Sequence, residues 1–189
     1  MHIGISVLTD EKVHNIARDL TFNLNKKYNT GTEAALLPQH ISLKQSFPYE
    51  YDIYAMEKFI EIFCSAMKPF KISVEKVKVN SLSEESILAW LKIKESSELQ
   101  NIHMKLCREL KTKFGIEPLG FDGKQWKFHS TLTFSNIDRR IKDELICEYN
   151  NKDISMEFEA KKIVMFCCMG DGNKTSEYFS LKIFNINNM

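Results

Sequence analysis

Two short segments of this 189-residue chain combine a histidine with a hydroxyl-bearing residue two positions later. The first, HISL, places Ser42 two residues after His40, and the second, HSTL, places Thr131 two residues after His129. The segments lie 89 positions apart, since 129 − 40 = 89. Both alternate as β-strands do, and in a strand residues i and i+2 point to the same face. Each strand is therefore expected to bury an apolar face and to present its histidine and hydroxyl on a wetter one.

Two histidines that converge on one group can carry out acid–base catalysis near neutral pH. Imidazole titrates near pH 6.5, so one ring can be neutral and accept a proton while the other is protonated and donates one. Phosphodiester cleavage needs such a pair, because the attacking oxygen loses a proton and the leaving oxygen gains one. The two hydroxyls can donate hydrogen bonds to the non-bridging phosphate oxygens. We therefore predict His40 and His129 as the catalytic pair and Ser42 and Thr131 as phosphate ligands, with no metal or other cofactor.

The residues around the two motifs allow further contacts with a substrate. Lys44 follows Ser42 by two residues and is expected on the same strand face, where it would either bind phosphate or be a solvated lysine. We count it as a third candidate phosphate ligand. Phe47, Tyr49 and Trp126 flank the motif strands and would either stack on a base or pack in the core.

Short strands that alternate with amphipathic helices must position these residues. Apolar periodicity predicts helices that begin after residues 9–10, after residue 48, near residue 97 and after residue 138. Strands are predicted over residues 2–8, 39–47, 70–79, 87–93, 128–134, 155–167 and 177–186. The order strand–helix–strand–helix–strand occurs twice, with related strands about 85–90 positions apart. We therefore predict one bilobal domain over residues 1–189, with an approximate internal repeat of residues 1–94 and 95–189.

Composition excludes several classes of protein. The chain has 26 Lys and Arg against 25 Asp and Glu, a net charge of +1. That balance disfavours binding along a long nucleic acid, where affinity comes from many phosphate contacts, and we expect no DNA duplex as a partner. The lysine-rich strands at residues 71–78 and 92–94 predict exposed edges, or alternatively a shallow path for RNA. Neither GxGxxG nor a P-loop motif occurs, which excludes those two nucleotide-binding classes.

The cysteines and the hydrophobic segments predict a cellular setting. Five cysteines without a CxxC pair fit neither a disulfide framework nor a zinc ribbon. The first ten residues, MHIGISVLTD, lack the basic and apolar regions of a signal peptide. No uncharged apolar run approaches the roughly 20 residues that a bilayer requires. We expect a cytoplasmic monomer with no membrane partner.

The pair HISL and HSTL, near positions 40 and 129 of a chain this size, resembles the two-histidine (2H) phosphoesterase superfamily, whose motif is written HxTx. The 2'-5' RNA ligase-like and cyclic phosphodiesterase members look most similar, although Ser42 stands where many relatives have Thr. The resemblance implies an α+β fold of two pseudo-symmetric lobes, each an antiparallel sheet with helices on its outer face, around a central cleft. It also implies His40 and His129 as the acid/base pair and Ser42 and Thr131 as phosphate ligands.

The activity that this resemblance implies is that of a metal-independent phosphodiesterase, a hydrolase of 2',3'-cyclic phosphates or 2'-5' phosphodiester bonds in nucleotides or RNA ends. Three alternatives stay open: an RNA 2'-5' ligase, an RNA 3'-end exonuclease, and a non-catalytic module that binds a phosphate or an RNA end. The two tetrapeptides distinguish neither these activities nor which histidine is the acid.

Overall fold

The computed structural model of the protein describes residues 1–172 and 174–187. Its strands are β1 (His2–Leu8), β2 (His40–Pro48), β3 (Phe70–Ser81), β4 (Ser86–Ile93), β5 (His129–Asn136), β6 (Asp153–Ala160), β7 (Lys162–Cys168) and β8 (Tyr178–Asn185). Its α-helices are α1 (Glu11–Tyr28), α2 (Ile53–Ser65), α3 (Ser97–Phe114) and α4 (Arg139–Tyr149), and two short 3₁₀ helices are η1 (Glu33–Leu36) and η2 (Thr175–Glu177). No helix in this part of the chain is long and apolar enough to cross a membrane.

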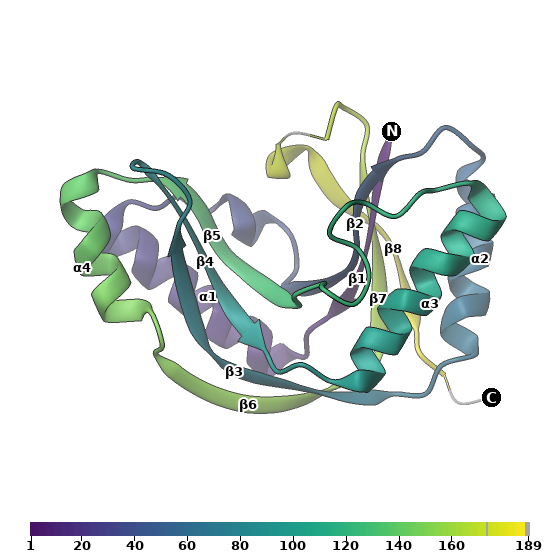
Figure 1. The fold of residues 1–189 in the computed structure, drawn as a ribbon, viewed down its shortest axis with the longest axis horizontal. Coiled ribbons are helices and arrows are strands. Elements are labelled where there is room, and N and C mark those ends of the chain that lie inside the picture. The colour runs from purple at the N-terminus through teal and green to yellow at the C-terminus, as the bar shows by residue number, and fades with distance from the viewer. Residues whose placement is uncertain (173, 188–189) are drawn as a thin grey trace.

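The strands form two four-stranded antiparallel sheets. The first sheet has the order β2-β1-β7-β8, and the second has the order β5-β4-β3-β6. Helices α2 and α3 pack against the first sheet, and α1 and α4 pack against the second (Figure 1). This arrangement confirms the predicted α+β fold of two antiparallel lobes with helices on their outer sides.

Local sequence signals set the ends of the helices that precede the two motif strands. Helix α1 begins where the Asp10 side chain accepts a hydrogen bond from the Val13 amide, and α3 begins at the corresponding cap by Ser96. At their other ends, Asn29 and Gly115 adopt the left-handed conformation, with φ of 54° and 68°. Each helix then buries one apolar face against a sheet, and that packing stabilises an otherwise marginal helix.

The strand predicted over residues 155–167 is wrong as a single element, because the chain changes sheets at Lys161. Strand β6 pairs with β3 at the edge of the second sheet, whereas β7 pairs with both β1 and β8 inside the first. Their burial patterns differ accordingly: β6 is exposed at every other residue, and β7 is buried from Ile163 to Cys168. No glycine or proline marks the junction, so the sequence gives no turn signal between the two strands.

Each sheet draws strands from both halves of the chain, because β3 and β4 join β5 while β7 and β8 join β1. The units β1-α1-β2 and β4-α3-β5 nevertheless hold the two motif strands in equivalent places. In both units the motif strand lies at the edge of its sheet and pairs with the strand that precedes the helix. From this correspondence we propose that the two units arose by internal duplication.

Candidate active site

The two motif strands approach each other although they belong to different sheets (Figure 1). Side-chain hydrogen bonds connect their N-terminal ends. The Ser130 hydroxyl donates to the carbonyl oxygen of His40 at 2.5 Å. The Gln39 amide donates to the Ser130 hydroxyl at 2.7 Å and to the carbonyl oxygen of Thr131 at 2.9 Å. Gln39 and Ser130 are buried, so these bonds hold the two strands in a fixed relation. Both residues were missed in the sequence analysis. Gln39 directly precedes His40 and Ser130 directly follows His129, and neither belongs to a recognisable motif.

Both histidines have the same ring orientation. The Nδ1 atom of His40 lies 2.8 Å from the carbonyl oxygen of Pro38, and that of His129 lies 3.0 Å from the carbonyl oxygen of Lys127. A carbonyl only accepts, so each Nδ1 carries the proton and donates it. In the neutral ring, Nε2 is then the atom with the free lone pair. The hydrogen bond from Nδ1 to the carbonyl two residues earlier thus leaves Nε2 of each imidazole available for proton transfer.

The surroundings of His40 favour its neutral form. Burial lowers its pKa, and the positive charge that His129 can carry acts in the same direction, while the bond to Pro38 opposes them. The Phe166 ring packs on the imidazole with 4.6 Å between ring centroids. His129 has a different aromatic neighbour, since Trp90 meets it edge-on at 6.1 Å.

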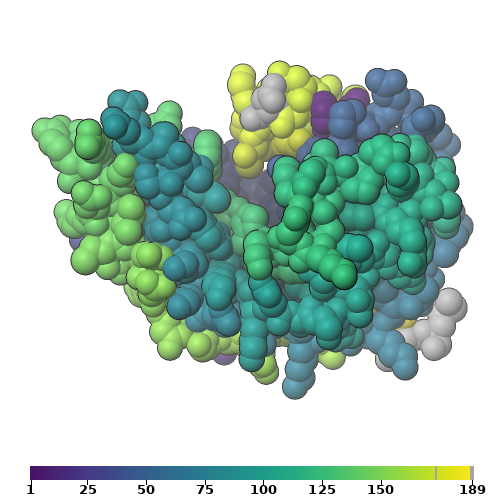
Figure 2. All heavy atoms as spheres, viewed as in Figure 1, coloured from purple at the N-terminus to yellow at the C-terminus, as the bar shows by residue number. Residues whose placement is uncertain are grey.

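A cavity of about 600 Å³ opens on the face of the first sheet that carries His40. Ser42, Lys44 and Thr131 line it together with His40, so four of the five expected catalytic or phosphate-binding residues border one space. The 3₁₀ helices η1 and η2 meet and contribute to its wall, and the molecule is hollowed in this region (Figure 2). His129 is not among the lining residues. It precedes the cavity-lining Thr131 by two positions and lies on the same face of β5.

Lys44 borders the cavity, but its side chain does not project on the face of His40 and Ser42, contrary to the alternation predicted from sequence. A β-bulge interrupts β2: Ser42 pairs with Ser6, but Lys44 pairs with Ile5, whose side chain is in the core. The Lys44 side chain is 1% exposed and forms an ion pair with Asp122, which is 0% exposed. Its ammonium is therefore already neutralised by a buried carboxylate.

The Lys44–Asp122 pair is part of an anchor that fixes the loop between α3 and β5. His103 of α3 has both ring nitrogens engaged, with Nδ1 2.6 Å from the Leu43 carbonyl oxygen and Nε2 accepting from the Gly123 amide at 2.9 Å. The Trp126 ring stacks on His103 at 5.0 Å between centroids. This loop leads directly into His129, so the anchor positions the second motif. No pattern around His103 in the sequence indicates this role.

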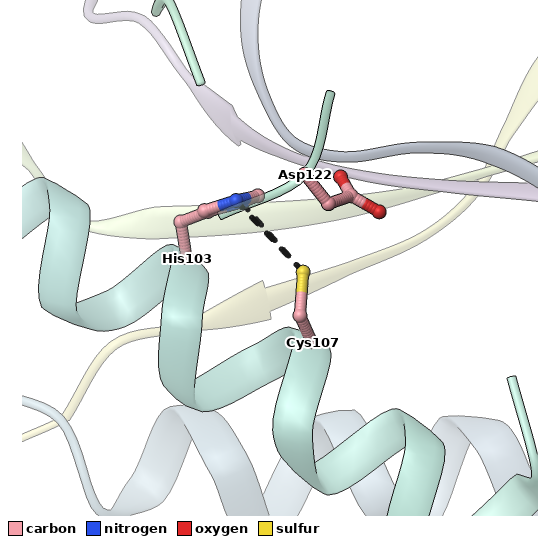
Figure 3. A group of neighbouring side chains, drawn as sticks. All are labelled: His103, Cys107 and Asp122. Atoms are coloured by element: carbon pink, nitrogen blue, oxygen red, sulfur yellow. Dashed lines mark hydrogen bonds between the residues drawn. The ribbon is translucent and has the colours of Figure 1, made fainter. Parts of the chain in front are cut away.

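One group of side chains in the described part of the chain has the spacing of a metal site: His103, Cys107 and Asp122 (Figure 3). These residues do not fit a metal as they stand. Neither ring nitrogen of His103 has a free lone pair, because one donates to a carbonyl and the other accepts from an amide. Burial raises the pKa of the Cys107 thiol to about 11, which keeps it protonated, and the Asp122 carboxylate is paired with Lys44.

The three aromatic residues that flank the motifs have structural roles. Phe47, Tyr49 and Trp126 are buried in the core, and Trp126 also donates through Nε1 to the carbonyl oxygen of Ser42 at 3.2 Å. Their core interpretation is therefore the correct one. The aromatic residues at the site are different ones, Phe134, Phe166 and Tyr178, which line the cavity.

Comparisons with known proteins agree with this geometry. Residues 10–166 match the family model of the 2'-5' RNA ligase superfamily. No curated protein sequence matches the chain. Among solved structures, the chain is similar to TT0787 of Thermus thermophilus, with 14% identity and a TM-score of 0.69 over 100% of this chain and 99% of that one. It is also similar to E. coli LigT complexed with 3'-AMP, with 12% identity and a TM-score of 0.56 over 99% and 98%.

A third similar structure is Kluyveromyces marxianus Usb1 with uridine monophosphate, with 10% identity and a TM-score of 0.52 over 98% of this chain and 97% of that one. At these identities, the structural likenesses show that the fold is shared over nearly the whole chain.

Proposed function

The chain belongs to the 2'-5' RNA ligase superfamily of 2H phosphoesterases, and on that premise we propose that it is a metal-independent phosphodiesterase. Its substrate would be a 2',3'-cyclic phosphate or a 2'-5' phosphodiester in a nucleotide or at an RNA end. The observation that carries the proposal is the matched pair of imidazoles. Each has Nδ1 bonded to the carbonyl two residues earlier and Nε2 left free, and the two strands that hold them are joined by Gln39 and Ser130.

In hydrolysis, His40 would act as the base and His129 as the acid. Nε2 of His40 takes a proton from water as the water oxygen forms its bond to phosphorus. The bond from phosphorus to a ribose oxygen breaks, and that oxygen takes the proton from Nε2 of His129. The lowered pKa of His40 supports this assignment, because a base must be neutral before it acts. In ligation, the incoming ribose hydroxyl would take the place of water and the roles would be the same; they would be exchanged only in the reverse of either reaction.

The hydroxyls of Ser42 and Thr131 would donate hydrogen bonds to the non-bridging oxygens of the phosphate. Both border the cavity beside His40, from opposite sheets. For Lys44 we propose a positioning role in place of direct phosphate binding, because its ammonium is held by Asp122 on the other face of the strand. A nucleotide substrate is supported by the two similar structures whose names include 3'-AMP and uridine monophosphate.

The pH dependence of kcat/KM tests the assignment of the base. Because burial and the charge of His129 lower the pKa of His40, the acid limb should lie below the ordinary imidazole value of about 6.5. Activity is lost as pH falls through the pKa of His40, since the base is then protonated. The alkaline limb should follow the loss of the acid's proton. Measured from pH 5 to 9, an acid limb above 6.5, or a rate that changes in one direction only, would contradict the assignment.

Removal of divalent ions with a chelator tests whether the reaction is independent of metal. Two imidazoles and two hydroxyls supply proton transfer and charge stabilisation, so dialysis against EDTA should leave kcat and KM for a 2',3'-cyclic nucleotide unchanged. Re-addition of Mg²⁺, Mn²⁺ or Zn²⁺ should not raise the rate. An EDTA-treated enzyme that is inactive until a divalent ion is returned would show that a metal takes part.

A further inference from the structure

The second sheet has an open face that begins at the catalytic strand. Across β5, β4 and β3, one row of paired residues is His129, Lys92 and Lys76, and the next is Thr131, Trp90 and Lys78. Residues that pair directly across neighbouring strands share a face, so these six side chains project on the same side. We call this surface, defined by the six residues, the β5–β4–β3 face.

Burial along the strands shows that this face is not covered by a helix. All six side chains are partly exposed, whereas the alternating residues Val77, Ala89 and Leu91 are fully buried on the opposite side, where α1 and α4 pack. Strands β3 and β4 lie on the surface beside the central hollow (Figure 2). With neighbouring strands about 4.8 Å apart, the three strands give a platform roughly 10 Å wide next to His129.

Lys78 leaves a positive charge on the β5–β4–β3 face. Lys76 and Lys92 pair directly across the strands, but a carboxylate lies beside each of them. Asp153 pairs with Lys76 across β3 and β6, and Glu75 forms an ion pair with Lys92 at 2.6 Å. Lys78 bonds to the neutral amide oxygen of Asn151 at 3.0 Å, and no carboxylate within the described residues lies within ion-pair distance of it. Its positive charge therefore remains available to a ligand.

Trp90 adds an aromatic surface between these lysines and the catalytic histidine. It pairs with Lys78 on one side and Thr131 on the other, and its ring contacts that of His129. Aromatic rings set among cationic side chains bind single-stranded nucleic acid, because bases stack on the rings while the cations contact phosphates. On the adjoining part of β5, Phe134 is 63% exposed and also borders the cavity. An extended strand could thus pass from the cavity to this face.

We infer that the β5–β4–β3 face binds the single-stranded RNA that continues from the scissile phosphate, with a base on Trp90 and a backbone phosphate at Lys78. The inference rests on the proposed function and extends it, because it makes an RNA end, and not a free nucleotide, the preferred substrate. The cavity of the first sheet would take the nucleotide on the other side of the phosphate.

The test is the binding of a labelled single-stranded RNA of about eight nucleotides with a 2',3'-cyclic phosphate end, followed by fluorescence anisotropy. All proteins carry His40→Ala, so that the RNA is not consumed. Lys78→Ala should weaken binding several-fold and lower the slope of log K against log salt by about 0.7. Trp90→Leu should weaken it by about tenfold or more, and Trp90→Phe should restore most of the affinity. The matched control is Lys26→Ala, which removes an exposed lysine from α1 on the other side of the sheet.

Activity separates the failure of this inference from that of the proposed function. With His40 intact, Lys78→Ala should leave kcat/KM for a 2',3'-cyclic mononucleotide unchanged and lower it for the RNA. If Lys78→Ala and Trp90→Leu bind RNA as Lys26→Ala does, or if no variant binds RNA, the face is not an RNA site. If Lys78→Ala and Trp90→Leu weaken RNA binding as expected but the enzyme turns over neither substrate, the face is an RNA site and the phosphodiesterase proposal is wrong.

Discussion

Replacing His40 or His129 by alanine should lower kcat for a 2',3'-cyclic nucleotide by at least two orders of magnitude. General acid and base groups each contribute roughly 10²–10⁴ in rate. The hydrogen-bond partners of both rings are backbone carbonyl oxygens, which cannot take over proton transfer when an imidazole is removed. The double variant should be little slower than either single variant, because the two groups act as a unit on one phosphate. Steady-state kinetics with a purified cyclic nucleotide measure all three variants.

The matched control is His2→Ala. His2 is partly exposed at the start of β1, contacts the carbonyl oxygen of Gly170 and does not line the cavity. Its loss should leave kcat within about twofold of the wild type, a small effect on the scale of acid–base catalysis. Turnover near the wild-type value in either His40→Ala or His129→Ala would refute the acid–base pair, whereas losses equal to that of His2→Ala would show that both rings are incidental.

The second large effect is expected in stability, from the buried pair of Lys44 and Asp122. Asp122→Asn leaves the ammonium of Lys44 buried without its counter-charge, and Lys44→Met does the same to the carboxylate. Breaking a buried ion pair in this way costs about 3–5 kcal/mol of unfolding free energy. Urea unfolding of each variant, followed by circular dichroism, gives the free energy.

The double variant Lys44→Met/Asp122→Asn completes the cycle. With both charges removed, much of the lost stability should return, because no uncompensated charge remains. It also decides the role of Lys44: if the ammonium only positions the loop before β5, the double variant should regain most of the wild-type KM. A fully stable double variant with a KM raised by an order of magnitude or more would instead make Lys44 a phosphate ligand.

The fold class and the two motif strands could be predicted because local patterns determine them. Strand alternation around His40 and His129 and the capped helices at Asp10 and Ser96 all appear in the structure near their predicted positions. The contents of each sheet could not be predicted, because no glycine or proline separates β6 from β7 and the two strands are distinguished only by their partners.

For the site, too, the sequence predicts the residues that a local pattern places and misses those placed by contacts between distant segments. Alternation places Ser42 beside His40, but the bulge that turns Lys44 away depends on the pairing of β2 with β1 and leaves no mark in the sequence. The roles of Gln39, Ser130 and His103 arise from contacts between segments about 60–90 residues apart. Trp90 was visible only as a strand residue, and Lys78 as part of a lysine-rich strand that could be an exposed edge or a path for RNA. Their common face with His129 emerges from the register of three strands.

The most direct test of the paired imidazoles is a crystal structure with a nucleoside 3'-phosphate bound. We expect one phosphate that lies between the two motif strands, with Nε2 of His40 and Nε2 of His129 each within about 3.2 Å of its oxygen atoms. The hydroxyls of Ser42 and Thr131 should contact the remaining oxygens. A phosphate that contacts only one of the histidines, or that binds elsewhere on the molecule, would contradict the claim that both imidazoles act on a single phosphorus.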